Sequence, residues 1–517
     1  MHIILRRILF SLLAVLVVTA AVVAGLLRDR SVLGRVTDAL SAELKAEVTI
    51  DSLSVRLLPT IRITGEGLTI RRLVDAPNHP PIIVAERFVV EPGLRQVLRG
   101  RASNVEMVGL RVTIPRRTSA DTTPETTARP AGERVQGAPR TVGRALIDRL
   151  VARDAELIYI SRNPEGPLRV FPVHEVELLD LSFDAPMAFS ARLTNPLPHG
   201  VVLSHGHFGP FDADEPGRSR IEGSYNFSEA DFGTLKGFSG QVHSQGVFAG
   251  ILDEVQVDGT TDSEDFQFDA GGAPTPLHTD FLALLDATTG DLTIVHLDGL
   301  LANSAFVATG HITRTNGHPG RQVVLDVEFP AGRLEDLLNF MVEAARPVMI
   351  GDLTLKAHIV IPTGEGRALD RMDLTGTIGL KDAQFSSRAS QARLREMSRR
   401  AQGRASGDPP DRALVGLAGT FRIQRARARF RSLTFRTQGA RVTLTGTYGV
   451  RDTSLNFTGT MRTDGPVSRV VGGVKGFLLR AVDPLFRKGG AGAVLPIRIS
   501  GTLADMEAGL EMRRIFK

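Results

Sequence analysis

The chain has 517 residues, of which 42% are hydrophobic and 23% charged, a composition typical of globular rather than disordered proteins. It contains no cysteine, which excludes disulfide scaffolds, thiol catalysis and cysteine-ligated zinc. The net charge of +5 comes from single arginines along the chain, so a nucleic-acid-binding face is not expected. The length predicts two or three domains, or one long repetitive sheet.

The N-terminal segment is the strongest single feature of the sequence. Residues from Ile8 to Leu27 carry no charge, and about 20 apolar residues allow a helix to cross the hydrocarbon core. Arg6 and Arg7 favour a cytoplasmic N-terminus, although two arginines after the segment weaken the asymmetry. We expect residues 1–30 to form a cytoplasmic tip and a transmembrane anchor. A cleaved signal peptide is the alternative, but its apolar region is usually only about 7–15 residues.

Residues 31–115 are predicted to form a first β-rich region. Apolar residues from Val32 to Leu44 have helical spacing and indicate a short amphipathic helix, followed by a strand at Glu47 to Ile50. The segments SLSVRLLPTIRITGEGLTI, ERFVVEP and NVEMVGLRVTIP then alternate apolar and polar residues. Such alternation is typical of half-buried strands.

Residues 116–140 are dominated by Thr, Pro, Ala and Arg without an apolar repeat, which predicts a flexible linker or long loop. A second β-rich region is expected at residues 141–330, with segments such as AELIYISR, SAFVATGHITR and QVVLDVEFP. The middle of the chain therefore continues the strand pattern of the first region.

Residues 331–517 are expected to form a third β-rich region with short helices. The segment AGRLEDLLNFMVEAARPV predicts a helix with Leu334, Leu338 and Met341 on one face. Strands are expected at LTLKAHIVIP, MDLTGTIGLKDAQF and AVLPIRISGTL, and the pattern is clearest around Val442, Leu444, Leu455 and Phe457.

A second amphipathic helix is expected between Arg469 and Lys488. Its apolar face contains Val470, Val474, Phe477, Leu478 and Leu485. This helix either lies on an anionic bilayer surface or caps the open end of the sheet, where unpaired backbone groups would otherwise recruit another strand.

The predicted fold is mainly β: a transmembrane helix followed by an antiparallel sheet with a few short helices. With roughly 12–15 residues for each strand and turn, the body can hold about 30 strands. A single twisted sheet of that size would be elongated, on the order of 100–150 Å.

Two regions of the chain resemble the AsmA-like family of envelope proteins, which are related to bridge-like lipid-transfer proteins. The first is the anchor followed by LSAELKAEVTIDSLSVRLLPTIRITGEGLTI. The second contains GRLEDLLNF, PVMIGDLTLKAHIVIPTGEG, LTGTIGLKDAQFSS and GVKGFLLRAVDPLFRKGGAGAVLPIRISGTLADMEAGLEM. Pro496, Ile499, Gly501 and Thr502 fit the family pattern, whereas Met506 stands where proline is common. The resemblance covers roughly the first 110 and the last 190 residues.

The resemblance implies a single-pass protein of the inner membrane, with a cytoplasmic N-terminus and a periplasmic body. In that family the sheet curls into an elongated open trough, a β-groove, that is associated with phospholipid movement and outer-membrane integrity. The expected partners are therefore phospholipids and the inner membrane, with other envelope proteins as further candidates, and neither a cofactor nor enzymatic activity is expected. A non-enzymatic scaffold or assembly factor for outer-membrane proteins is the alternative function.

Alternating strands suit lipid binding because every second side chain faces the same side and can contribute to a continuous apolar floor. The candidate lining residues are Val442, Leu444, Leu455 and Phe457. The alternative is that these residues pack against a second layer as ordinary core, since periodicity does not show which apolar face is covered.

Motifs for catalysis or metal binding are weak. His199, His205 and His207 form a cluster, but no acidic residue has a recognisable spacing to it, so a turn with solvated histidines is expected. The acidic stretch contains Asp258, Asp262, Glu264, Asp265 and Asp269 and lacks the spacing of an EF-hand. We expect no metal site, and the absence of G-x-S-x-G and H-E-x-x-H motifs argues against a hydrolase.

Overall fold

The computed structural model of the chain describes most of the body and leaves several segments outside its described part. The described residues are 34, 37, 38, 41, 46–56, 61–72, 81–92, 102–114, 147–159, 169–182, 185–196, 198–210, 216–235, 237–268, 272–315, 320–341, 347, 349–386, 388, 392, 415–437, 439–463, 493–502 and 506–510. The expected anchor at Ile8 to Leu27, the linker at 116–140 and the helix from Arg469 to Lys488 lie outside them. Nowhere in the described part is there a helix of sufficient length and apolarity to span a bilayer.

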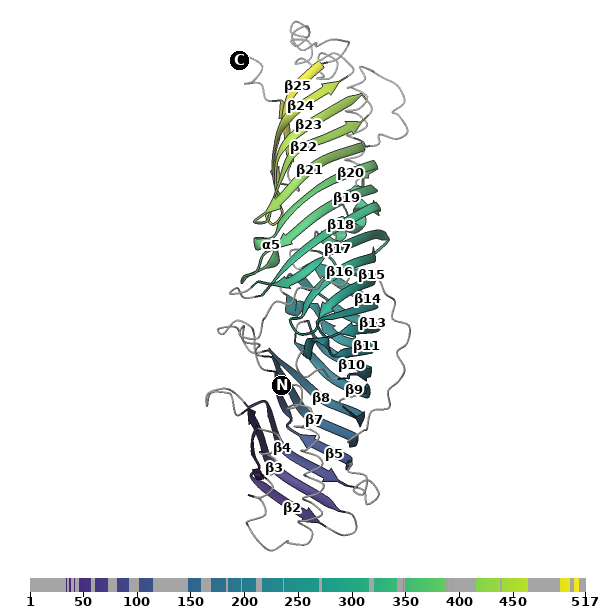
Figure 1. Cartoon of the computed structure of the whole chain (residues 1–517). Coiled ribbons are helices and arrows are strands. Elements are labelled where there is room, and N and C mark those ends of the chain that lie inside the picture. Colours follow the sequence, from purple (N-terminus) through teal and green to yellow (C-terminus); the bar gives the residue numbers. More distant parts are fainter. Residues whose placement is uncertain are drawn as a thin grey trace, which may run out of the picture. The chain divides into compact units, whose positions relative to one another are not determined.

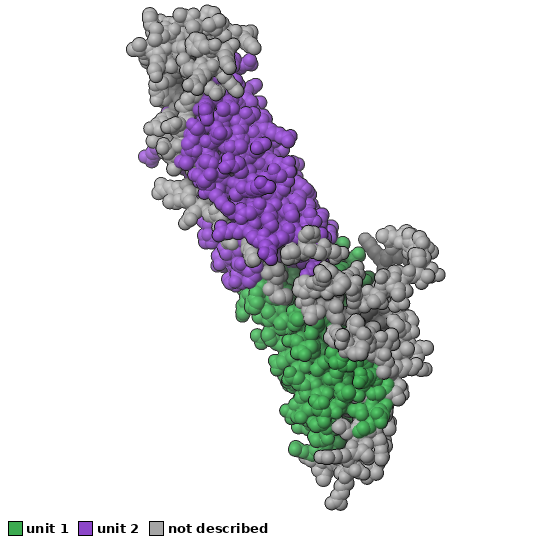
Figure 2. Space-filling model, turned by 90° about the vertical axis from the view of Figure 1, so that its left-hand side faces the viewer, with its two compact units in different colours: residues 1–230, 243–259, 284–290 green, residues 231–242, 260–283, 291–517 purple. Residues whose placement is uncertain are grey.

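The described residues are mainly β, with 26 strands and few helices, and nearly all strand pairs are antiparallel. This confirms the mainly β, antiparallel fold expected from the alternating sequence. The chain divides into two compact units, shown in different colours in Figure 2. Unit 1 comprises residues 1–230, 243–259 and 284–290, and unit 2 comprises residues 231–242, 260–283 and 291–517.

Most strands of unit 1 precede residue 231, and Figure 1 labels many of them. They are β1 (Ala46–Thr49), β2 (Ser52–Arg56), β3 (Arg62–Arg72), β4 (Ile83–Glu91), β5 (Ala102–Val108), β6 (Arg111–Ile114), β7 (Ile147–Tyr159), β8 (Arg169–Leu181), β9 (Met187–Pro196), β10 (His199–Phe208) and β11 (Arg220–Asp231), with a 3-10 turn η2 (Pro216–Arg218). Strands β13 (Gln241–Ile251), β14 (Glu254–Phe268) and β15 (Thr275–Asp286) contribute residues to both units.

Unit 2 holds the longest series of paired strands. Its elements are η3 (Phe232–Leu235), β12 (Phe238–Ser239), β16 (Asp291–Leu301), β17 (Ser304–Arg314), β18 (Arg321–Arg333), α4 (Leu334–Met341), β19 (Met349–Ile361), α5 (Ala368–Arg371), β20 (Asp373–Phe385), β21 (Val415–Gln424), β22 (Arg427–Thr437), β23 (Ala440–Gly449), β24 (Ser454–Thr463), β25 (Ala493–Thr502) and β26 (Met506–Leu510). From β16 to β26 each strand pairs antiparallel with the next in sequence.

Several individual elements follow the sequence pattern closely. The strand expected at Glu47 to Ile50 is β1, shifted by one residue, and the helix expected after residue 331 is α4. The order of the motifs does not reveal that β5 and β6 both pair with β7 in parallel. Strand β7 is therefore the parallel neighbour of both strands.

The core of unit 1 lies on one face of its first strands. Buried residues include Val48, Ile63 and Phe88, each at most 4% exposed. Their register places Ile63 opposite Val90 and Val48 opposite Ile70, so the apolar positions of neighbouring strands meet on the same face. Burial of this face is the principal stabilising contribution that the alternating sequence can provide.

Phenylalanine rings lie over glycines on the neighbouring strand at several positions. Gly65 pairs with Phe88, and a Cβ atom built on Gly65 would be 2.2 Å from Phe88 Cζ. Gly299 and Phe306 repeat this arrangement, again with 2.2 Å between the built Cβ and the ring. The ring covers backbone that glycine leaves open, so both residues are required for close packing.

We expect Gly65→Val to lower stability by about 1–3 kcal/mol, because the added side chain overlaps the buried Phe88 ring. Thermal unfolding of the full chain measures this effect. The double variant Gly65→Val/Phe88→Leu should cost less than the sum of the single changes, since leucine vacates part of the space. Gly416→Val is the control, because the nearest atom to its built Cβ is 3.8 Å away. Equal losses in both glycine variants would contradict the packing argument.

Candidate functional site

One face of strands β18 to β25 is mainly apolar, and its polar positions include Arg321 at the start of β18 and Thr437 and Thr463 at the ends of β22 and β24. The cross-strand register aligns the apolar residues in rows that contain no charged side chain. One row contains Leu325, Ile359, Leu374, Ile423, Ala428, Tyr448, Leu455 and Gly501. Another contains Leu353, Leu380, Leu417, Phe435, Val442, Met461 and Leu495. The face therefore offers a continuous apolar surface across eight consecutive strands.

The four candidate lining residues all lie on this apolar face. Val442 and Leu455 are half-buried, whereas Leu444 is 7% and Phe457 is 6% exposed. The Phe457 ring lies 5.6 Å from that of Phe430, centroid to centroid. A bulge in β22 lies between Phe430 and Leu433, and it keeps Phe430 and Leu433 on the apolar face. Val442 and Leu455 are thus the accessible pair, and Leu444 and Phe457 are packed as core residues.

Helix α4 covers part of the apolar face. Leu334 of the helix is buried with Leu353 and Leu380 of the sheet, and Leu337 and Leu338 pack against the same cluster. Two carboxylates at the start of the helix hold it in place. Asp336 accepts hydrogen bonds from the Asn303 amide at 3.0 Å and from Ser304 Oγ at 2.8 Å.

An aromatic cluster fills space next to the C-terminal end of α4. The ring of Phe340 stacks on that of Phe266 at 5.2 Å, and Phe266 stacks on Phe238 at 5.4 Å. Phe268 belongs to the same cluster and is buried with Leu369 of α5. The chain thus covers part of its own apolar face with α4 and these rings, while residues such as Val442, Leu455 and Ile499 stay partly exposed.

Glu335 is the second carboxylate that fixes the start of α4. Its Oε2 accepts a hydrogen bond from the Gly351 amide at 3.2 Å, and its Oε1 accepts one from Arg333 Nε at 2.7 Å. Burial raises the pKa of Glu335, but hydrogen bonds from its own amide, Arg333 and Gly351 outweigh it and bring the pKa below the ordinary 4.5. The ionised carboxylate is therefore the form that holds the helix.

Because the pKa of Glu335 is lower in the folded state than in the unfolded state, its carboxylate stabilises the fold above pH 4.5. This stabilisation is lost as the pH falls through the pKa of the folded state. We expect Glu335→Gln to lower stability at neutral pH by about 1 kcal/mol and to match the parent protein in acid. Thermal unfolding across a pH series measures the difference. Glu365→Gln, at an exposed position, is the control. A difference that stays constant into acid would disprove the role of the carboxylate.

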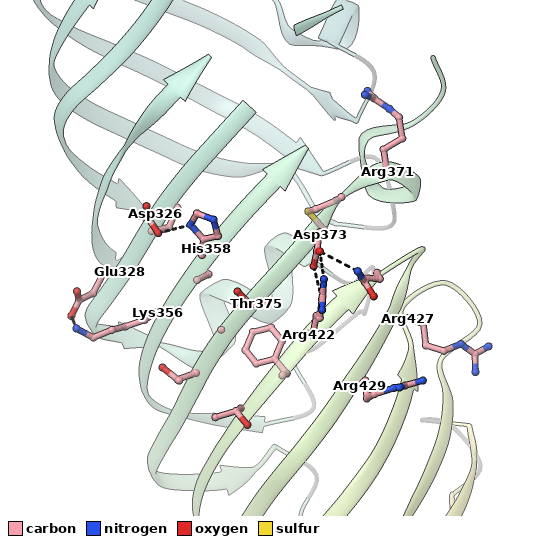
Figure 3. A pocket seen from close by; sticks show the side chains of 18 of the residues that line it. Asp326, Glu328, Lys356, His358, Arg371, Asp373, Thr375, Arg422, Arg427 and Arg429 are labelled. Atoms are coloured by element: carbon pink, nitrogen blue, oxygen red, sulfur yellow. Dashed lines mark hydrogen bonds and ion pairs between the residues drawn. The ribbon is translucent and has the colours of Figure 1, made fainter. Parts of the chain in front are cut away.

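The opposite face of the same strands is polar and holds a cavity of about 1740 Å³. Figure 3 shows cross-strand contacts along its wall: a hydrogen bond between Asp326 and His358, and an ion pair between Glu328 and Lys356. Asp373 receives hydrogen bonds from Arg422, and these lower the pKa of Asp373 below its ordinary value. The strands up to β20 therefore balance positive with negative side chains.

This balance ends at β21. The five strands from β21 to β25 contain no Asp, Glu or Lys, and they carry eight arginines: Arg422, Arg427, Arg429, Arg431, Arg436, Arg441, Arg462 and Arg498. All eight are exposed. Among the described residues, only Arg422 of these eight forms an ion pair. The segment RARARFR already groups several of these arginines in the sequence, whereas Arg436, Arg441 and Arg462 meet only through the strand register.

The histidine and acidic candidates for metal binding are resolved as strand residues. His205 Nε2 contacts Ser224 Oγ at 3.0 Å, and His207 Nδ1 lies 3.8 Å from Glu222. His199 opens β10, so the three histidines occupy a strand and not the expected turn. In the part of the chain that the structure describes, no group of His, Asp and Glu could hold a metal ion.

The acidic stretch also lies on a strand instead of the expected solvated loop. Asp258, Asp262, Glu264 and Asp265 belong to β14, and Asp269 lies outside the described residues. Asp262 Oδ1 lies 2.6 Å from His278 Nδ1, and Asp280 Oδ2 lies 3.3 Å from His278 Nε2. The hydrogen bond to Asp262, with the charges of both carboxylates, raises the pKa of His278 above 6.5.

We expect the NMR titration of His278 to give a pKa above 6.5, and Asp262→Asn to lower it, since the asparagine supplies no negative charge. The imidazole chemical shift as a function of pH is the measurement. Asp253→Asn, at another exposed aspartate, should leave the His278 titration unchanged. An identical titration in parent and Asp262→Asn would rule out the ion pair.

The proposed membrane-surface or end-cap residues Val470, Val474, Phe477, Leu478 and Leu485 lie outside the described residues. Comparison of the chain with protein-family models, curated proteins and solved structures gives no match.

Proposed function

We propose that this chain is an inner-membrane-anchored, periplasm-facing protein that binds phospholipid along the apolar face of β18 to β25. In this proposal the sheet acts as a curled, elongated trough and Ile8 to Leu27 tethers one end at the bilayer. The protein would conduct lipid or hold it in transit, and would so support the lipid balance of the outer membrane. No catalytic step is required.

The observation that carries this proposal is the unbroken set of apolar rows across eight strands. An acyl chain needs a continuous apolar surface, because each interruption by a charge would leave that charge without water. Val442 and Leu455 are only half-buried, so the chain itself does not cover the entire face. Partly exposed apolar surface of this extent is typical of a binding site.

The resemblance to AsmA-like proteins supports the same function. The segments that carry it include MIGDLTLKAHIVI in β19, LTGTIGLKDAQF in β20 and AVLPIRISGT in β25. These three strands contribute Ile359, Leu374 and Ile499 to the apolar face. The resembling segments and the proposed lipid-binding surface thus coincide.

The direct test is mass spectrometry of lipids that remain with the full chain after purification in mild detergent. We expect phospholipid in the parent protein and a reduced amount in Val442→Asp, because the carboxylate would interrupt the apolar row. Thr443→Asp is the matched control, since it adds the same charge on the opposite face of the same strand. Thermal unfolding of both variants checks that the fold is retained.

A photocrosslinker at Leu455 distinguishes lipid binding from scaffolding. The half-buried Leu455 side chain lies on the apolar face, so lipid adducts are expected there. Protein adducts without lipid adducts would favour the scaffold function. If mass spectrometry found no phospholipid with the parent protein, the lipid-binding proposal would be contradicted.

A further inference from the structure

Three arginines lie in one cross-strand row on the polar face. Arg436 of β22 is directly opposite Arg441 of β23, and Arg441 is directly opposite Arg462 of β24. Directly opposed side chains on neighbouring strands have Cβ atoms about 4.5–5.5 Å apart, and like charges at this spacing are destabilising. No ion pair within the described residues offsets these three charges. Repulsion within this row therefore lowers the free energy of unfolding when no anion is bound to the protein.

The residues around this row are hydrogen-bond donors. The adjacent row on the same polar face contains Thr434, Thr443 and Thr460, which lie opposite one another on β22, β23 and β24. Threonine hydroxyls can donate to the same anionic groups that guanidinium forks bind. The polar face of β22 to β24 therefore presents donors in two adjacent rows, with no carboxylate to compete for them.

The geometry of the guanidinium group indicates which anions this face can bind. All eight cations of β21 to β25 are arginine and none is lysine, and the planar guanidinium binds two oxygens of one phosphate where lysine acts as a point charge. Arginine is the common cation of the whole chain, with 55 arginines against 7 lysines, so an anionic partner is indicated by the directly opposed guanidinium groups and not by the absence of lysine. The chemistry thus points to phosphate groups at a surface.

Nucleic acid fits this face poorly. Single-stranded nucleic acid is held by aromatic rings between the basic residues, because the bases stack on them. The aromatic residues of these strands, including Phe430, Phe435 and Phe457, are all in the apolar rows of the other face. Only phosphate contacts would be available to such a partner.

We propose that the arginine face of β21 to β25, centred on Arg436, Arg441 and Arg462, docks onto the headgroup surface of an anionic phospholipid bilayer. Each arginine near such a surface adds attraction that falls with salt. The apolar rows lie on the reverse side of the same strands, so docking would bring the proposed trough next to a membrane. The choice of a lipid headgroup over other phosphate carriers rests on the proposed lipid-binding function.

The test uses the full chain in vesicles of phosphatidylcholine and measures its capture of a second, fluorescent vesicle population. Vesicles that contain phosphatidylglycerol should be captured, and capture should weaken as sodium chloride rises. Arg436→Gln/Arg441→Gln/Arg462→Gln should reduce capture by about tenfold or more. The same variant should unfold at an equal or higher temperature than the parent, because three opposed charges are removed.

Arg62→Gln/Arg149→Gln/Arg153→Gln is the matched control. It removes the same number of positive charges, but from arginines that pair with Glu91, Glu177 and Glu175. We expect this variant to capture anionic vesicles as the parent does. Equal loss in both triple variants would show that only net charge matters and would overturn the proposed surface.

Other outcomes that overturn the proposal are equally specific. Capture of pure phosphatidylcholine vesicles to the same extent would show that the surface does not recognise anionic headgroups. Competition by inorganic phosphate beyond that of chloride at equal ionic strength would indicate a site for a single phosphate. Equal binding to polyglutamate-coated beads would indicate an acidic protein partner.

Failure of docking and failure of the trough are separate results. Lipid in the trough is measured by co-purification and depends on Val442, on the apolar face. Docking is measured by vesicle capture and depends on Arg441, the preceding residue, on the polar face. Loss of one readout with the other intact assigns the failure to one face.

Discussion

The two-residue alternation of side chains along a strand is the constraint on which the structure depends. Because neighbouring residues point to opposite faces, an antiparallel register with few shifts keeps two separate surfaces across many strands. In unit 2 this separation holds from β18 to β25, with apolar rows on one face and polar rows on the other. A slip of one residue at any strand would place arginine and threonine among the apolar side chains.

Bulges are the places where this alternation is adjusted without being lost. In β22 the bulge adds one residue, because Arg431 and Ser432 lie opposite the single residue Thr445, and the flanking Phe430 and Leu433 both remain on the apolar face. The shifts in β18 near Phe329 and in β20 near Leu380 occur close to Leu353, where α4 packs. Bulges bend a strand and increase its twist, so they allow the sheet to follow the helix that covers it.

The two faces are stabilised differently along the chain. On the polar side, pairs such as Arg149 with Glu177 and Lys356 with Glu328 cancel charges across strands, although exposed pairs add little stability. The strands β22 to β25 contain no Asp or Glu, and on their polar face Arg436 lies opposite Arg441 and Arg441 opposite Arg462. Burial of the apolar face stabilises the sheet and offsets the repulsion between the arginines. The sheet can therefore stay folded while its polar face remains suited to binding an external anion.

The sequence alone determined the mainly β fold, the strands around Val442 and Leu455, and the helix that begins at Leu334, because alternation and helical spacing are local properties. It also indicated which residues share a face. Only the tertiary structure decided that Leu444 and Phe457 are buried while Val442 and Leu455 stay accessible, since that depends on Phe430 across the sheet. It likewise revealed the arginine row, because residues at positions 436, 441 and 462 become neighbours only through the strand register. Register arises from long-range pairing, which no local sequence period encodes.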